Sequence, residues 1–152
     1  MNTLLEFECD LISLNRFSKK LAEKTRVGDL FLLSGDLGAG KTTFARAFIK
    51  SLFDIHKIKQ PKFIKSPSFP IMINYPLEDY EICHYDLYRL SNKNELSEIG
   101  IFEELKNNIS IIEWPDIIVS NFSIRQYYLI EFKIINLKKR LLKILHSEKK
   151  IF

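Results

Sequence analysis

Residues 35–42 read Gly-Asp-Leu-Gly-Ala-Gly-Lys-Thr and satisfy the pattern GxxxxGK[ST] without a mismatch. This stretch contains three of the chain's five glycines, at positions 35, 38 and 40. Glycines allow the backbone to curl so that successive N–H groups point at one phosphate with no Cβ in the way. The apolar run 30–33 before the stretch predicts a buried strand, and residues 42 to about 53 predict a helix. We therefore expect a phosphate-binding loop between a strand and a helix.

The residue types in this loop suit the binding of a nucleotide phosphate and its metal ion. Lys41 is expected to reach the β- and γ-phosphates of ATP as a positive charge, and the Thr42 hydroxyl to ligate Mg²⁺. The start of the following helix adds unpaired N–H groups and its positive dipole end. The residues expected to bind ATP or ADP in this loop are Asp36, Leu37, Gly38, Ala39, Gly40, Lys41, Thr42 and Thr43.

A loop of this kind needs a second acid for the metal, at the end of a neighbouring buried strand. Glu113 follows the apolar run 109–112, and Asp86 follows the less purely apolar run 82–85. The quality of the runs favours Glu113 as the Mg²⁺ ligand and Asp86 as a contact of the water or the metal-bound water. Which of the two acids positions the attacking water stays open.

The remaining patterns predict an α/β fold. We expect one P-loop NTPase-like domain over residues 1–152, with a mixed, mainly parallel central sheet flanked by helices. A helix that Asp10 or Ser13 caps should run to about residue 26, and Gly100 should interrupt short acidic helices over 94–106. The expected strands are 3–9, 30–33, 82–87 and 109–112, with an antiparallel C-terminal hairpin over 127–135 and 140–146 and loops with an irregular edge strand over 57–76.

Composition narrows the functional class only a little. The 152 residues are 46% hydrophobic and carry a formal charge of +4. The excess of lysine can come from an AT-rich coding sequence as easily as from nucleic-acid binding. Cys9 and Cys83 have no paired spacing, so neither a zinc site nor a disulfide framework is expected. No apolar run is long enough to span a membrane, and the acidic N-terminal stretch is unlike a signal peptide. We therefore expect a cytoplasmic protein.

A second hydroxyl that could contact the nucleotide, besides that of Thr42, follows the basic residues of 57–65. Ser68 lies in the run Ser-Pro-Ser-Phe at 66–69. A hydroxyl on a mobile loop can sense the γ-phosphate as a switch does, although an ordinary Ser-Pro turn fits the same residues.

Four segments in order resemble a known family. They are GDLGAGKTT at 35–43, KSPSF at 65–69, HYDLYR at 84–89 and IEWP at 112–115. Together they resemble the TsaE family, small bacterial ATPases of tRNA threonylcarbamoyladenosine biosynthesis. The acidic segment 95–101 also resembles the family, whereas the two ends match only in length and strand pattern.

The resemblance implies a roughly seven-stranded mixed sheet and slow ATP hydrolysis, coupled to a TsaB–TsaD complex that attaches threonylcarbamoyl to an adenosine beside the tRNA anticodon. By position, Lys41 and Thr42 serve phosphate and Mg²⁺, and Glu113 is the second metal acid. Asp86 is the nucleotide-site aspartate and Ser68 the switch hydroxyl. Trp114 stands where the family has a functionally sensitive tryptophan. The expected catalytic set is Lys41, Ser68, Asp86 and Glu113.

Two departures and two alternatives accompany this interpretation. Pro70 stands where the family usually has Thr, which should stiffen the switch, and the lysines of 57–65 are unusual and could contact tRNA or an acidic partner face. No arginine finger is evident, Arg89 being the nearest arginine in a motif. The alternatives are a P-loop small-molecule kinase and a nucleotide-gated binding module with little catalysis.

Overall fold

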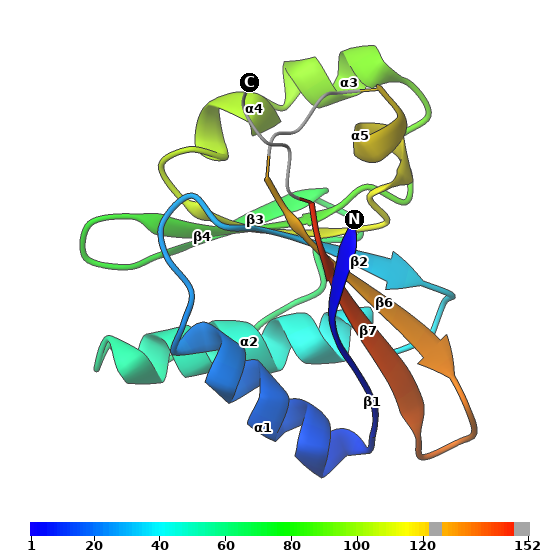
Figure 1. Ribbon diagram of the computed structural model, residues 1–152. Helices are drawn as coiled ribbons and strands as arrows, with labels where there is room; N and C mark the ends of the chain where they lie inside the picture. The colour runs from blue at the N-terminus through cyan, green and yellow to red at the C-terminus, as the bar shows by residue number, and fades with distance from the viewer. Residues whose placement is uncertain (122–125, 148–152) are drawn as a thin grey trace.

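The computed structural model describes residues 1–121 and 126–147 (Figure 1). Strands and helices alternate along most of the chain. The order is β1 (Asn2–Cys9), α1 (Leu11–Ala22), β2 (Leu30–Gly35), α2 (Lys41–Ile55), β3 (Met72–Pro76), β4 (Glu81–Asp86), α3 (Lys93–Glu98), α4 (Ile101–Glu104), β5 (Ile109–Glu113), α5 (Asp116–Asn121), β6 (Tyr128–Ile134) and β7 (Arg140–His146).

The strands form a seven-stranded sheet in the order β1-β7-β6-β2-β5-β4-β3. Its centre is parallel, because β2 pairs in parallel with both β5 and β6, and β4 pairs in parallel with β5. The margins are antiparallel: β7 pairs with β6 and β1, and β3 pairs with β4. The predicted mixed sheet, its parallel centre and the C-terminal hairpin of β6 and β7 are therefore confirmed.

Helices cover both faces of this sheet. The pair α1 and α2 lies on one face, and α3, α4 and α5 lie on the other (Figure 1). The side chains of β2 alternate between the two hydrophobic cores: Phe31 and Leu33 join the core under α1 and α2, whereas Leu30 and Leu32 join the opposite core. A strand buried on both faces reads as an unbroken apolar run, which is why β2 was predictable.

The start of α1 follows the predicted capping signal, but the helices differ from the sequence prediction in two places. Asp10 caps α1, since its carboxylate accepts a 2.8 Å hydrogen bond from the Ser13 N–H, and Ser13 completes the capping box. The helix ends at Ala22, earlier than expected. The short helix α5 was not predicted, although Pro115 and Asp116 at its start are common helix-initiating residues.

The proline-rich segment provides the predicted edge strand. Strand β3 lies at one end of the strand order and pairs with β4 alone. Pro76 lies at its last position, where a missing N–H is tolerated. Among the helices of the part of the chain that the structure describes, none is long and apolar enough to cross a membrane.

Candidate functional site

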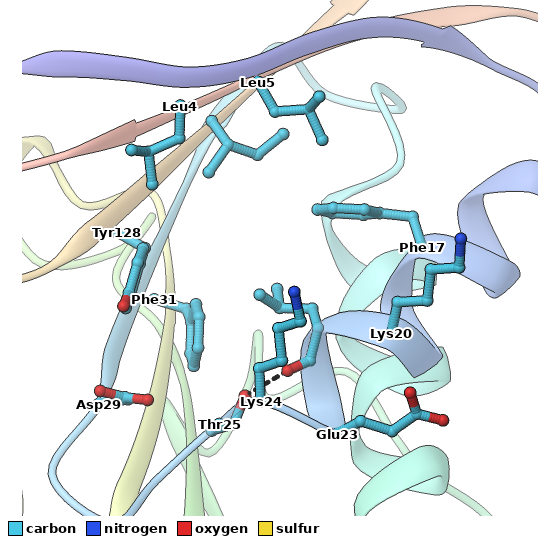
Figure 2. Close-up of a pocket in the computed structure, with 12 residues that line it drawn as sticks. Leu4, Leu5, Phe17, Lys20, Glu23, Lys24, Thr25, Asp29, Phe31 and Tyr128 are labelled. Carbon is cyan, nitrogen blue, oxygen red and sulfur yellow. Dashed lines mark hydrogen bonds between the residues drawn. The ribbon is translucent and has the colours of Figure 1, made fainter.

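Two of the cavities in the described part of the chain differ clearly in their chemistry. The larger, about 650 Å³, is a groove between α1 and the sheet that Leu4, Leu5, Phe17, Phe31 and Tyr128 line with mostly apolar groups (Figure 2). The smaller, about 280 Å³, lies at the end of β2 and contains the phosphate-loop residues. Because phosphate chemistry needs N–H donors, a cation and acids, the smaller cavity is the candidate active site.

The smaller cavity brings most of the predicted residues together. The phosphate loop contributes glycines, and the start of α2 contributes hydroxyls. The acids come from the ends of β4 and β5, and two serines come from the segment before β3. The lining residues are Leu37, Gly38, Gly40, Lys41, Thr42, Thr43, Ser66, Ser68, Asp86, Glu113 and Trp114. Of the predicted nucleotide residues, Asp36 and Ala39 do not line this cavity, although both lie in the same loop.

The backbone of the loop requires its glycines. Gly35, Gly38 and Gly40 have φ angles of 144°, 76° and 109°, in the region that residues with a Cβ rarely adopt. Gly40 is the N-cap of α2 and provides no side-chain cap, so the first N–H groups of this helix remain available to a ligand. The loop therefore has the form of an anion-binding helix N-terminus.

We expect Gly35→Ala to destabilise the fold by about 3 kcal/mol or more, because positive φ and a backbone clash act together. A Cβ at position 35 would lie 2.5 Å from the Phe132 carbonyl oxygen in β6. Gly38→Ala is the matched control, since a Cβ there meets nothing within 4 Å and only its φ is unfavourable. Urea unfolding of both variants measures the difference, and equal losses would contradict the clash.

Two side chains hold both oxygens of the Glu113 carboxylate. The Thr42 hydroxyl donates a 2.8 Å hydrogen bond to Oε2, and His84 Nε2 lies 2.9 Å from Oε1. Glu113 is 2% exposed and His84 is fully buried. A hydroxyl and a carboxylate are the hard oxygen ligands that Mg²⁺ prefers, so Thr42 and Glu113 fit a magnesium ion beside the phosphate loop.

Asp86 lies at the end of β4, directly opposite Glu113 in the parallel register. Its carboxylate accepts a 3.0 Å hydrogen bond from the Tyr88 N–H. Burial raises the pKa of Asp86 above its ordinary value, the hydrogen bond from Tyr88 opposes this, and the negative charge of Glu113 raises the pKa further. Asp86 and Glu113 thus end the neighbouring strands β4 and β5, and both line the cavity beside the phosphate loop.

Lys41 is folded back onto its own loop. Its ammonium donates hydrogen bonds to the carbonyl oxygens of Gly35 and Asp36, and lies 3.8 Å from the centre of the Trp114 ring. Burial lowers the pKa of Lys41, whereas the charges of Glu113 and Asp86 act in the opposite direction. The ammonium therefore contacts the loop carbonyls and the indole, and the charges of both acids act on it.

Trp114 has an unusual backbone. Its φ is +57°, and its N–H donates a 3.2 Å hydrogen bond to the Leu33 carbonyl of β2. The Tyr88 ring packs against the indole at a tilt of 53°, with 4.8 Å between the ring centres. Strain of this kind at a non-glycine residue is typical of functional sites.

Sequence reasoning missed Arg140, which contacts the phosphate loop from β7. Its Nε donates a 3.1 Å hydrogen bond to the Ala39 carbonyl oxygen. Its Nη2 donates a second one, of 3.3 Å, to the Gly38 carbonyl oxygen. A cavity of about 180 Å³ adjoins this contact and shares Gly38, Gly40 and Thr43 with the candidate site. No local pattern could have found Arg140, because 101 residues separate it from Ala39.

Two basic features of the sequence lie outside the candidate site. Arg89 stacks 5.3 Å from the Phe69 ring and does not line the cavity. None of Lys57, Lys59, Lys62 and Lys65 lines it either.

Comparison with known proteins identifies the family. A family profile described as threonylcarbamoyl adenosine biosynthesis protein TsaE matches residues 10–142. A Rickettsia felis protein named tRNA threonylcarbamoyladenosine biosynthesis protein TsaE is 42% identical over 103 residues, which are 68% of this chain and 57% of that protein. The Rickettsia prowazekii protein of the same name is 36% identical over 136 residues, which are 90% of each chain.

The chain spans little more than half the length of the Rickettsia felis relative, but nearly all of the Rickettsia prowazekii one. The crystal structure of Bacillus subtilis YdiB has a similar fold, with a TM-score of 0.72, 23% identity, and coverage of 97% of this chain and 88% of YdiB. Since the profile covers most of the chain and the relatives agree with it, the chain belongs to the TsaE family.

Proposed function

We propose that this chain is a Mg²⁺-dependent ATP hydrolase required for threonylcarbamoyl modification of the adenosine next to the tRNA anticodon. The observation that carries the chemistry is the hydrogen bond from Thr42, at the start of α2, to Glu113, at the end of β5. It joins the phosphate loop to an acid on the neighbouring strand, as the metal site of a P-loop hydrolase requires. The names of the Rickettsia relatives support the role in tRNA modification.

The proposed catalytic roles follow from the positions of the side chains. The N–H groups around Gly38 and Gly40 bind the phosphates of ATP, and Lys41 leaves its loop carbonyls to contact them. Bound Mg²⁺ would supply neutralisation of phosphate charge, with Thr42 and Glu113 as the residues that hold it. Asp86 or Glu113 orients the attacking water, and Ser68 closes toward the γ-phosphate. The base and ribose would extend toward the adjoining cavity, which Asp10, Leu14 and Arg140 help to line.

The structure also supports weak turnover by the isolated chain. Among residues 1–121 and 126–147, no arginine lines the phosphate cavity. Charge supplied by an arginine close to the transferred phosphoryl group accounts for a large part of catalysis in related hydrolases. We propose that a TsaB–TsaD complex increases turnover, and that tRNA takes part indirectly or through the basic segment 57–65.

Tracing the label of γ-³²P-ATP tests the reaction type. We expect all released label to appear as inorganic phosphate, because the cavity holds acids that can orient water. A labelled organic product would instead identify a small-molecule kinase. ATP that binds but is not consumed, even with TsaB–TsaD and tRNA present, would identify a nucleotide-gated binding module.

A further inference from the structure

The His84 side chain is buried beside the metal-binding acid and has no role in the proposed chemistry so far. It lies in β4, two residues before Asp86, and is fully buried. Its Nε2 lies 2.9 Å from Oε1 of Glu113. In the described part of the chain, its other ring nitrogen, Nδ1, has no hydrogen-bond partner. The single polar contact of this imidazole is therefore with Glu113.

The contact has a defined direction. A carboxylate accepts hydrogen bonds and donates none, so Nε2 must carry the hydrogen and donate it to Oε1. The Thr42 hydroxyl donates to Oε2 from the opposite side, at 2.8 Å. Glu113 is thus held at both oxygens, in a site where it is 2% exposed.

A glutamate needs this support more than an aspartate does, because it has one more rotatable bond to fix. Without the His84 donor, Oε1 would be buried with no hydrogen bond among those the structure describes, and the carboxylate could turn away from Thr42. Groups that orient a metal ligand in this way commonly change metal affinity by about 10–100-fold when they are removed.

We propose that His84 is a positioning residue that orients the Glu113 carboxylate toward the metal bound beside Thr42. This inference rests on the proposed function, since it assumes that Glu113 holds the metal. It assigns a role to the first residue of the HYDLYR segment that the phosphate chemistry leaves unexplained.

Three variants separate positioning from packing. His84→Gln keeps an N–H donor at the reach of Nε2, whereas the amide nitrogen of His84→Asn reaches only about as far as Nδ1. His84→Leu keeps apolar bulk and removes the donor. Binding of Mn²⁺ to the protein–ADP complex, followed by electron paramagnetic resonance, measures the metal site without turnover. ADP binding in EDTA, followed by the fluorescence of the chain's single tryptophan, measures the nucleotide site alone.

We expect His84→Asn and His84→Leu to weaken Mn²⁺ binding about 10–100-fold and His84→Gln to retain wild-type affinity. ADP affinity in EDTA should be unchanged in all three. Wild-type Mn²⁺ affinity in His84→Asn and His84→Leu would overturn the inference, and so would an equal loss in His84→Gln or a matching loss of ADP affinity in EDTA. If the wild-type protein bound ADP but no Mn²⁺, the proposed function would fail, and this inference with it.

Discussion

Lys41→Ala is expected to reduce ATP hydrolysis about 10²–10³-fold, the scale of losing one preorganised charge at a reacting group. Lys41 is 4% exposed, and its ammonium donates hydrogen bonds to the carbonyl oxygens of Gly35 and Asp36. No other lysine and no arginine lines the candidate cavity within the described residues, so nothing there replaces its charge. Phosphate release from Mg²⁺–ATP measures the effect.

The control for this substitution is Lys50→Ala, an exposed lysine later in the same helix, which should retain wild-type turnover. Lys41 also donates two hydrogen bonds to the loop, so thermal unfolding of both variants must accompany the kinetics. A folded Lys41→Ala protein with wild-type turnover would show that the loop is not the catalytic phosphate site.

Glu113→Gln is expected to reduce hydrolysis about 100-fold or more and to raise the Mg²⁺ concentration needed for half-maximal activity. The substitution keeps the size of the side chain but removes the negative charge that would face the proposed metal. The new amide can present the carbonyl oxygen to the His84 N–H and the NH₂ to the Thr42 hydroxyl, which then accepts instead of donating, so the lost charge is the main change. Turnover measured across a Mg²⁺ titration gives both quantities.

Glu131→Gln, an exposed glutamate on β6, is the matched control and should behave as wild type. An unchanged Mg²⁺ requirement in Glu113→Gln would remove Glu113 as the metal acid and leave Asp86 as the alternative. If Glu113→Gln lost hydrolysis but supported tRNA modification fully, the nucleotide-gated binding module would be the better account.

The elements around the loop were predictable because their signals are local. The glycines of 35–42, the apolar run before them and the helical spacing after them lie within about one supersecondary unit. Glu113 and Asp86 could be selected because acids at the carboxyl ends of parallel strands meet at the edge where ligands bind. Their placement in one cavity agrees with that reasoning, and their separate roles stay predictions.

The missed contacts depend on register and on distant pairing. His84 stands in a segment that the sequence singled out, but its contact with Glu113 follows from the parallel pairing of β4 with β5. Arg140 reaches the loop because β6 lies beside β2 and β7 lies beside β6. The hairpin of β6 and β7 has a local signal, but a single sequence has none for the pairing of β6 with β2 or of β4 with β5. The roles of Ser68 and the basic segment 57–65 also stay predictions, since both depend on bound nucleotide or partners.

The most direct test of the account is ATP turnover by the purified chain, alone and with a TsaB–TsaD complex and tRNA, with Lys41→Ala measured in parallel. We expect slow phosphate release by the chain alone, clearly faster release with the complex, and almost none from Lys41→Ala in either condition. Equal turnover with and without the complex, or stimulation that Lys41→Ala retains, would contradict it.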